Sequence, residues 1–196
     1  MTYEEYYGDY YKNLLTTETA LCKKAESIKN MYRETEDLQP VVYYCSRIKR
    51  PDSMMRKLHD RGFPQGLEYA LGYVYDAVGI RIICSFASDV FTVMDKLEHD
   101  PEIEIKEKKD YLSHPKSNGY RSVHLCILLK TTGMLAEIQI RTIAMDFWAT
   151  LEHQLKYKKN IKGESLIKSE LKRCADEIAS TDLQMQTIRE ILKEIQ

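Results

Sequence analysis

Two segments with alternating side chains, joined by a short turn, constrain the fold of this chain more than any other part of its sequence. Residues 122–130 read SVHLCILLK and residues 135–142 read LAEIQIRT, with TTGM at 131–134 between them. A period of two between polar and apolar residues is typical of β-strands, and a short connection containing glycine favours a hairpin. The sequence therefore predicts two neighbouring antiparallel strands.

The same alternation divides the side chains of the hairpin between two faces. The apolar face is predicted to carry Val123, Leu125, Ile127, Leu129, Ile138 and Ile140. The opposite face is predicted to carry Ser122, His124, Cys126, Glu137, Gln139 and Arg141. Three long polar side chains in a row on one short strand are unusual for plain sheet surface. We interpret this second face as the floor of a polar site.

Segments before the hairpin alternate between helical and β patterns. The predicted elements are a helix over 3–37, a strand or extended segment over 41–49, a helix over 52–61, a strand over 78–84 and a helix that opens at Ser88. The first has Leu14, Leu21 and Ile28 at intervals of seven, which indicates one buried helical face. The strand 78–84 (VGIRIIC) is rich in β-branched residues, which favour extended structure.

Helical patterns also follow the hairpin. One helix is predicted from Ala144, and after Gly163 two more are predicted, over 164–178 and 182–195. The last has Thr181 with Gln184 three residues later, which is the pattern of a capping box. This succession predicts an α+β fold in which helices cover a mixed or antiparallel sheet. We expect one domain, with an N-terminal helical segment (1–39), a core (40–158) and C-terminal helices (159–196).

Charge and hydropathy argue against several classes of protein. The chain has 29 lysines and arginines and 30 aspartates and glutamates, so its formal net charge is −1 and a polybasic nucleic-acid coat does not fit. No apolar run approaches the roughly 18 residues that a membrane span needs. Five widely spaced cysteines without a CxxC pair argue against a disulfide framework, and Cys84 and Cys126 read as small buried apolar residues. We expect a cytoplasmic protein with no membrane partner.

Two acidic side chains are candidates for a metal site. Asp76 precedes the predicted strand 78–84, and Glu137 lies on the polar face of the strand 135–142. Carboxylates from neighbouring strands, completed by substrate phosphates, suit Mg²⁺. Globular proteins contain such pairs by chance, so this spacing alone also fits a structural role.

Cations gather around the start of the helix 52–61. The positive charges between residues 45 and 57 are Arg47, Lys49, Arg50, Arg56 and Lys57. Only Asp52 opposes them, and Ser53 lies in the first turn of the predicted helix. Such a set would form a cradle for phosphate groups. A solvated basic surface is the alternative.

The segment 108–124 (KKDYLSHPKSNGYRSVH) is the most informative. Asn118-Gly119 predicts a tight turn, and the residues flanking it are Lys116, Tyr120, Arg121 and His124. An aromatic ring beside cations suits a nucleotide, because the ring can stack on the base while the cations bind phosphates. A plain hairpin turn would explain Asn118-Gly119 but not its neighbours.

Four segments together resemble one known family. They are SRIKRPDSMMRKL, DAVGIRIIC, KKDYLSHPKSNGYRSVH and EIQIRTIAMDFWATLEHQLKYK, in this order. They strongly resemble the synthetase domain of the RelA/SpoT family, over roughly residues 40–158, and within it the single-domain small alarmone synthetases. The resemblance implies a mixed sheet of the nucleotidyltransferase type with helical extensions at both ends.

The resemblance also implies a reaction. Such enzymes transfer the β,γ-pyrophosphate of ATP to the ribose 3′-OH of GDP or GTP and release AMP. We therefore expect ATP and GDP or GTP as substrates and Mg²⁺ as cofactor. Asp76 and Glu137 match the Mg²⁺-binding carboxylates, and Glu137 is expected to accept the proton of the attacking hydroxyl.

Two nucleotide sites are implied as well. On the ATP side, the residues that match the phosphate motif are Arg47, Lys49, Ser53 and Lys57. Arg47 and Arg81 match the arginines that sandwich the adenine ring, where planar guanidinium groups stack and lysine cannot. On the acceptor side, Tyr120 matches the residue that stacks on guanine, and further matches are Lys116, Asn118, His124, Gln139 and Glu152. Asp146 matches the residue that reads the guanine edge, since a carboxylate can accept from N1–H and the 2-amino group.

Other functions stay open at this stage. The dipeptides His59-Asp60 and His99-Asp100 resemble parts of a metal-dependent phosphohydrolase site. Toxin-like relatives of the same domain use adenine nucleotides or the 3′ end of transfer RNA as acceptor, and lysines at 156, 158, 159 and 162 could contact RNA. A binding module without activity is the third alternative, which loss of the metal carboxylates would indicate.

The resemblance further implies self-association. Small members of the family form tetramers through terminal helices, and some bind single-stranded RNA or are regulated by their product. We expect a homo-oligomer, most simply a tetramer, from the apolar stripes of 164–196. At 196 residues the chain has room for a synthetase with helical flanks but not for a second catalytic domain.

Overall fold

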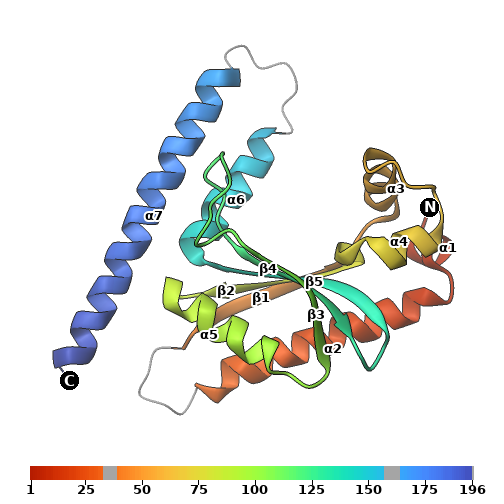
Figure 1. Ribbon diagram of the computed structural model, residues 1–196, viewed down its shortest axis with the longest axis horizontal. Helices are drawn as coiled ribbons and strands as arrows, with labels where there is room; N and C mark the ends of the chain where they lie inside the picture. Colours follow the sequence, from red (N-terminus) through yellow and green to blue (C-terminus); the bar gives the residue numbers. More distant parts are fainter. Residues whose placement is uncertain (33–38, 157–163, 196) are drawn as a thin grey trace.

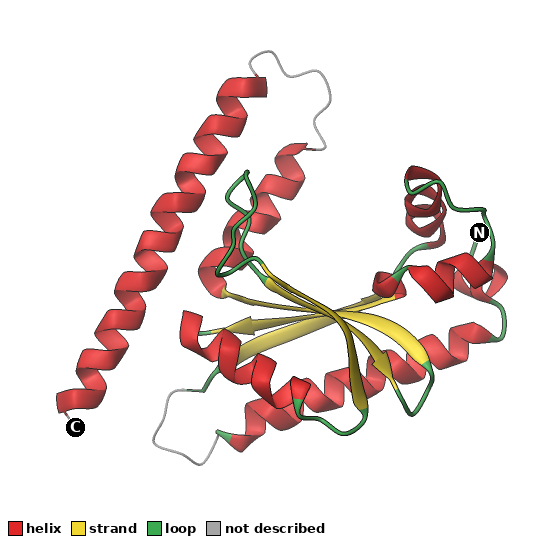
Figure 2. Ribbon diagram, viewed as in Figure 1, coloured by secondary structure: helices red, strands yellow, loops and turns green. Residues whose placement is uncertain are grey.

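A five-stranded mixed sheet lies at the centre of the computed structural model, which describes residues 1–32, 39–156 and 164–195 (Figures 1 and 2). The strands are β1 (Val41–Ile48), β2 (Val78–Cys84), β3 (Ile103–Asp110), β4 (Val123–Leu129) and β5 (Met134–Thr142). Their order is β1-β2-β5-β4-β3. Only β2 and β5 run parallel, and the other three pairs are antiparallel. The predicted α+β fold with a mixed sheet is confirmed.

The predicted hairpin and its two faces are present. Strands β4 and β5 pair antiparallel, so that His124 lies opposite Gln139 and Cys126 opposite Glu137. The six residues assigned to the apolar face are all buried in the core. Each such aliphatic side chain contributes about 1.5–3 kcal/mol when it is fully buried. The alternation in sequence was therefore sufficient to orient the sheet.

Two helices cover the apolar face. They are α2 (Tyr10–Met31), which packs on β1 and β2, and α5 (Ala87–Glu98), which packs mainly on β5 and β3 (Figure 1). Leu14, Leu21 and Ile28 of α2 are buried, as their spacing predicted. Because both helices lie on the same side, the polar face of the sheet is left for other contacts.

The polar face is flanked at its two ends. At one end lie α3 (Pro51–Asp60) and α4 (Leu67–Tyr73), and at the other lie α6 (Ile143–Lys156) and α7 (Glu164–Ile195) (Figure 1). A short 3₁₀ turn, η1 (Tyr75–Ala77), leads into β2 and carries Asp76. These flanking elements lie on the same side of the sheet as its polar face, although they are far apart in the sequence.

The prediction of one helix over 3–37 was wrong at its start. A separate helix α1 (Tyr3–Tyr7) ends at Gly8, whose φ of +53° is a left-handed conformation that interrupts the helix. Helix α2 then begins at Tyr10. The last part of the predicted helix, residues 33–37, lies outside the described residues.

The prediction of two C-terminal helices was also wrong, because α7 is continuous. The hydroxyl of Thr181 donates to the carbonyl oxygen of Glu177 at 3.0 Å, one turn earlier in the same helix, instead of capping a new one. No glycine or proline occurs between residues 164 and 195. Nothing in the sequence therefore breaks the helix where the capping pattern predicted a start.

Strand β3 and helix α4 were not predicted. Strand β3 reads IEIKEKKD, and its charges resemble a solvated linker. It is an edge strand bonded only to β4, and charged edges of this kind are ordinary in native sheets.

Among the described residues, no helix has both the length and the apolar character needed to cross a membrane. All five cysteines are free, and Cys84 and Cys126 are buried as expected.

Candidate active site

Strand pairing arranges the polar side chains in two rows across the sheet. In the first, Arg81 of β2 pairs with Gln139 of β5, which pairs with His124 of β4. In the second, Glu137 of β5 lies between Gly79 and Cys126. Residues that are neighbours across strands point to the same face. The predicted polar floor is therefore a real surface, built from three central strands.

Asp76 is held by two lysines. Nζ of Lys49 and Nζ of Lys57 each donate to one of its carboxylate oxygens, both at 2.7 Å. Burial by itself would raise the pKa of Asp76, but the two ammonium groups outweigh burial and lower that pKa. Burial lowers the pKa of Lys49, and the charge of Asp76 opposes this shift. Asp76 is ionised at neutral pH.

Glu137 has its own pair of donors. Nδ1 of His124 lies 3.1 Å from Oε1, and Nε2 of Gln139 donates to Oε2 at 2.9 Å. Burial would raise the pKa of Glu137, but the hydrogen bond and charge of His124 lower it overall. A second ionised carboxylate therefore lies at the centre of the polar face.

The two carboxylates are close enough to interact. The negative charge of Asp76 acts to raise the pKa of Glu137. Paired ionised carboxylates are hard oxygen donors, which suit Mg²⁺ when substrate phosphates complete its coordination. In the described part of the chain, no group of three or more His, Cys, Asp or Glu could hold a metal alone. The donor set thus fits a metal that arrives with a phosphate substrate.

A basic pocket lies beside Asp76. It has a volume of about 490 Å³, and its charged or hydroxyl-bearing lining includes Arg47, Lys49, Arg50, Ser53, Arg56 and Lys57. These residues come from the end of β1 and the first turns of α3, the segment predicted to form a phosphate cradle. A pocket with this excess of positive charge favours a polyanionic ligand.

The loop between β3 and β4 carries the second predicted group. The hydroxyl of Tyr120 lies 2.8 Å from Nε2 of His124, and Lys116 Nζ lies 5.1 Å from the centre of the Tyr120 ring. Asn118 donates from Nδ2 to Oε1 of Glu152 in α6 at 3.1 Å. The structure therefore brings together residues that sequence matching assigned to the acceptor nucleotide.

Asp146, at the start of α6, accepts from three side chains. Arg141 Nη2 lies 2.9 Å and Arg81 Nη1 3.3 Å from Oδ1, while the Tyr43 hydroxyl donates to Oδ2 at 2.8 Å. Tyr43 was not among the predicted site residues. Arg141 had appeared only as one member of the polar face, and its burial at 2 % exposure was not foreseeable from alternation.

Comparison with known proteins identifies the family. Residues 46–162 match the family described as "Region found in RelA / SpoT proteins". The chain belongs to the RelA/SpoT family. Two curated relatives come from Bacillus subtilis strain 168. GTP pyrophosphokinase YwaC is 39% identical over 163 residues, covering 80% of this chain and 78% of the relative, and GTP pyrophosphokinase YjbM is 32% identical over 179 residues, covering 88% and 83%.

Solved structures agree with this RelA/SpoT membership. The small alarmone synthetase 1 of Bacillus subtilis, bound to its product pppGpp, has a TM-score of 0.82 at 31% identity, with 91% of this chain and 93% of that chain covered. A GTP pyrophosphokinase family protein of Streptococcus pneumoniae has a TM-score of 0.85 at 32% identity, with 100% and 97% covered. The helices at both ends of the chain are thus part of the shared fold.

The phosphohydrolase alternative finds no counterpart in the structure of this RelA/SpoT member. The side chains of His59 and His99 are 85% and 77% exposed. Each lies at the end of a helix, one closing α3 and the other following α5. Of the lysines considered for RNA contact, 158, 159 and 162 lie outside the described residues.

Proposed function

We propose that this chain is a GTP pyrophosphokinase that makes ppGpp or pppGpp. It transfers the β,γ-pyrophosphate of ATP to the ribose 3′-OH of GDP or GTP and releases AMP. Relatives with this name support the reaction. The observation that carries it is the position of ionised Glu137, on a polar face with a basic pocket on one side and the Tyr120 loop on the other.

The basic pocket binds the donor. Lys49, Lys57, Arg47 and Ser53 surround space that suits the triphosphate of ATP. Arg81 and Arg47 lie on neighbouring strands of the same face, since Arg47 pairs with Gly79 two residues before Arg81. Planar guanidinium groups at these positions stack on adenine.

The loop side binds the acceptor. Tyr120 stacks on guanine, and Asp146 accepts hydrogen bonds from the guanine edge in place of one or more of its present donors. The remaining acceptor contacts come from Lys116, Asn118, His124, Gln139 and Glu152. This arrangement holds the ribose of the acceptor near Glu137, because Gln139 and His124 both bond to that carboxylate.

Transfer needs one proton acceptor and stabilised charge. The 3′ oxygen of the acceptor attacks the β-phosphorus of ATP, the bond from that phosphorus to the α,β-bridging oxygen breaks, and AMP leaves with the bridging oxygen. Glu137 takes the proton of the 3′-OH, which its lowered pKa permits at neutral pH because the carboxylate is ionised. Lys49, Lys57 and Arg47 stabilise the charge on the transferred phosphates.

Asp76 and Glu137 would hold Mg²⁺ together with the nucleotide phosphates. When bound, the ion neutralises phosphate charge and lowers the pKa of the hydroxyl. The protein's own contribution is to keep both carboxylates ionised, through the lysines around Asp76 and through His124 and Gln139 around Glu137.

The test is a product assay with several acceptors. Purified protein receives ATP labelled at the γ-phosphate together with GDP, GTP, GMP, unlabelled ATP or transfer RNA, with and without Mg²⁺. We expect label in a guanosine 3′-pyrophosphate and an equal amount of AMP. Label appearing only in free phosphate or pyrophosphate, or on the transfer RNA, would reject the proposal. The four arms with nucleotide acceptors also rank GDP, GTP, GMP and ATP.

We further propose that the chain forms a homotetramer in the cytoplasm, where its nucleotides are. Exposed apolar residues along α7, among them Leu183, Ile188 and Leu192, support self-association. Light scattering on the purified protein tests this, and a monomer at micromolar concentration would reject it. Binding of single-stranded RNA or of the product as a regulator is tested by adding each to the same assay.

A further inference from the structure

The loop between β3 and β4 is in direct backbone contact with the C-terminal helix α7. Gly119 has a φ of +89°, and a Cβ added there would overlap Cβ of Ala175 and lie 3.2 Å from Cδ of Lys172. Both the conformation and the lack of space therefore require glycine. Ala175 is only 4% exposed, so the loop covers it.

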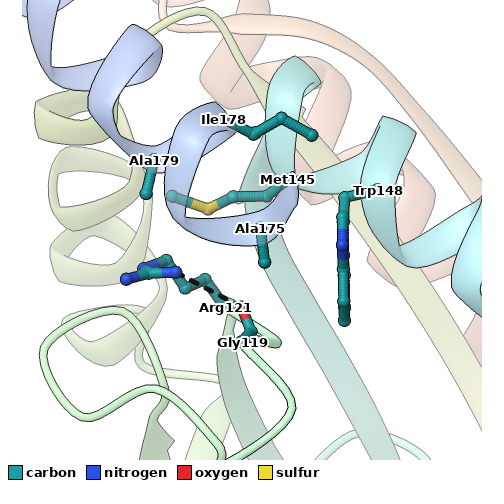
Figure 3. A pocket seen from close by; sticks show the side chains of 7 residues that line it. All are labelled: Gly119, Arg121, Met145, Trp148, Ala175, Ile178 and Ala179. Atoms are coloured by element: carbon teal, nitrogen blue, oxygen red, sulfur yellow. Dashed lines mark hydrogen bonds between the residues drawn. The ribbon is translucent and has the colours of Figure 1, made fainter. Parts of the chain in front are cut away.

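The contact is tightly packed. Figure 3 shows Gly119 and Arg121 of the loop facing Met145 and Trp148 of α6 and Ala175 of α7. The space among them is about 10 Å³, close to the lower limit for one water molecule. A larger side chain on α7 at this point has no room unless the loop moves.

Helix α7 is itself fixed to the body of the protein. Nε1 of Trp148 donates to the carbonyl oxygen of Leu171 at 2.8 Å, and the hydroxyl of Thr142 donates to Oδ2 of Asp182 at 2.6 Å. Thr142 also accepts from the backbone N–H of Met145 at 3.2 Å, so the same residue anchors the start of α6. A helix held at several points can act as a rigid support for a loop.

Gly119 lies between two residues that contact the acceptor in the proposed function. The side-chain oxygen of Asn118 accepts from the backbone N–H of Tyr120 at 3.2 Å, which closes the turn around Gly119. Asn118 also bonds to Glu152 of α6. Any displacement of Gly119 therefore moves Asn118 and Tyr120 together.

We propose that Ala175 is a positioning residue for the acceptor nucleotide. Its small side chain lets the loop dock on α7, and docking sets the place of Tyr120 and Asn118. This inference rests on the proposed function for the assignment of the loop to GDP or GTP. It adds a role for α7, an element outside the polar face, in the affinity of one substrate only.

The first test replaces Ala175 by leucine and uses Cys174→Leu as the matched control. Cys174 is its exposed neighbour on the same helix, so the control adds similar bulk without meeting the loop. We expect KM for GDP to rise about tenfold in Ala175→Leu, with KM for ATP and kcat at saturating GDP changed by less than about twofold, and no change in the control. An unchanged KM for GDP, or an equal rise for both nucleotides, would overturn the proposal.

A readout without catalysis separates this inference from the proposed function. Trp148 is the only tryptophan of the chain and is 5% exposed beside the loop. We expect Ala175→Leu to shift its emission to longer wavelength and to speed hydrogen exchange of residues 111–122, whereas Cys174→Leu leaves both unchanged. If the wild type makes no ppGpp while these shifts occur, the proposed function fails and the docking stands. Unchanged emission and exchange would overturn the docking itself.

A surface variant guards against misfolding of Ala175→Leu. Oδ1 of Asp176 lies 3.8 Å from Nη2 of Arg121 in the loop, and its side chain is 50% exposed. Glu177, one position further, is 62% exposed and pairs with Arg173 on the same helix. We expect Asp176→Lys to raise KM for GDP about threefold and Glu177→Lys to leave it unchanged. Equal effects of the two charge reversals would overturn the proposal.

Discussion

Nδ1 of His124 lies 3.1 Å from Oε1 of Glu137. Because an ionised carboxylate only accepts, Nδ1 carries the proton of this bond, and Nε2 on the other side of the ring lies 2.8 Å from the hydroxyl of Tyr120. A hydrogen bond to the charged form of an acid favours that form. His124 therefore links Glu137, the proposed base, to Tyr120 of the β3–β4 loop.

Replacing His124 by alanine should move the acid limb of the pH–rate profile. The pKa of Glu137 is lowered in the folded protein with help from His124, so removing the imidazole raises that pKa. Glu137 then becomes protonated at higher pH, and kcat/KM begins to fall at higher pH than in the wild type. The measurement is kcat/KM from about pH 4 to pH 9, because the lowered pKa of Glu137 places the wild-type limb at the acid end of this range.

Tyr120→Phe is the matched control for this shift. It removes the partner of Nε2 but leaves Nδ1 on Glu137. The acid limb should stay in place in this variant. If the acid limb of His124→Ala lies at the same pH as in the wild type, or at lower pH, His124 does not lower the pKa of Glu137.

Glu137→Gln should abolish transfer while both nucleotides still bind. The amide keeps the shape of the side chain but takes no proton, and a general base typically contributes 10²–10⁴-fold, so kcat should fall at least about 100-fold. Product formation and calorimetric titration with ATP and GDP give the two readouts. Activity close to the wild type would exclude Glu137 as the base.

Tyr120→Ala should weaken the acceptor much more than the donor. Loss of stacking on a base costs about 1–3 kcal/mol, which corresponds to roughly a 5- to 150-fold rise in KM for GDP. Tyr120→Phe keeps the ring and should stay near the wild-type value. The measurement is KM for ATP and KM for GDP, determined separately for each variant. An equal rise in both KM values would contradict stacking of Tyr120 on guanine.

Asp76→Asn should change how stability depends on pH. Lys49 and Lys57 lower the pKa of Asp76 below the unfolded value of about 3.9. The ionised carboxylate therefore stabilises the folded protein above that pH, and this stabilisation is lost as the pH falls through the pKa of Asp76 in the folded protein. The difference in free energy of unfolding between wild type and variant should be largest near neutral pH and shrink below about pH 4. Urea denaturation at several pH values measures it.

Asp60→Asn serves as the control for this stability series. Asp60 has a side chain that is 66% exposed at the end of α3, so its removal should have little effect at any pH. If the difference in free energy of unfolding between wild type and Asp76→Asn does not change with pH, the lysine contacts do not depend on ionisation of Asp76, and the prediction is wrong.

Much of the fold followed from local pattern. Alternation in residues 122–142 predicted the central hairpin and separated its aliphatic side chains from its polar ones, because a period of two has only one arrangement that buries the aliphatic residues. The exact strand β2 and the helices α3, α5 and α6 were also recognisable from short-range signals. The break at Gly8 and the continuity of α7 were not, since a glycine or a capping pattern can be overridden by its surroundings.

Residue types and motifs also predicted the candidate site residues. Asp76, Glu137 and the cations of 47–57 were singled out by their kind and by family resemblance. The sequence did not show that Lys49 and Lys57 both hold Asp76, nor that Asp146 is shared by Arg81, Arg141 and Tyr43. Strand register and helix docking decide these contacts.

By itself, the sequence determined the central hairpin, its buried face and its set of polar residues, because these depend on periods and side-chain types within a few residues. Only the tertiary structure decided which charges meet and where the β3–β4 loop lies. Gly119 and Ala175 are distant in the chain. No local pattern indicates that residue 119 must be glycine because Ala175 of α7 lies against it. Contacts of this kind arise from packing, which depends on all the elements at once.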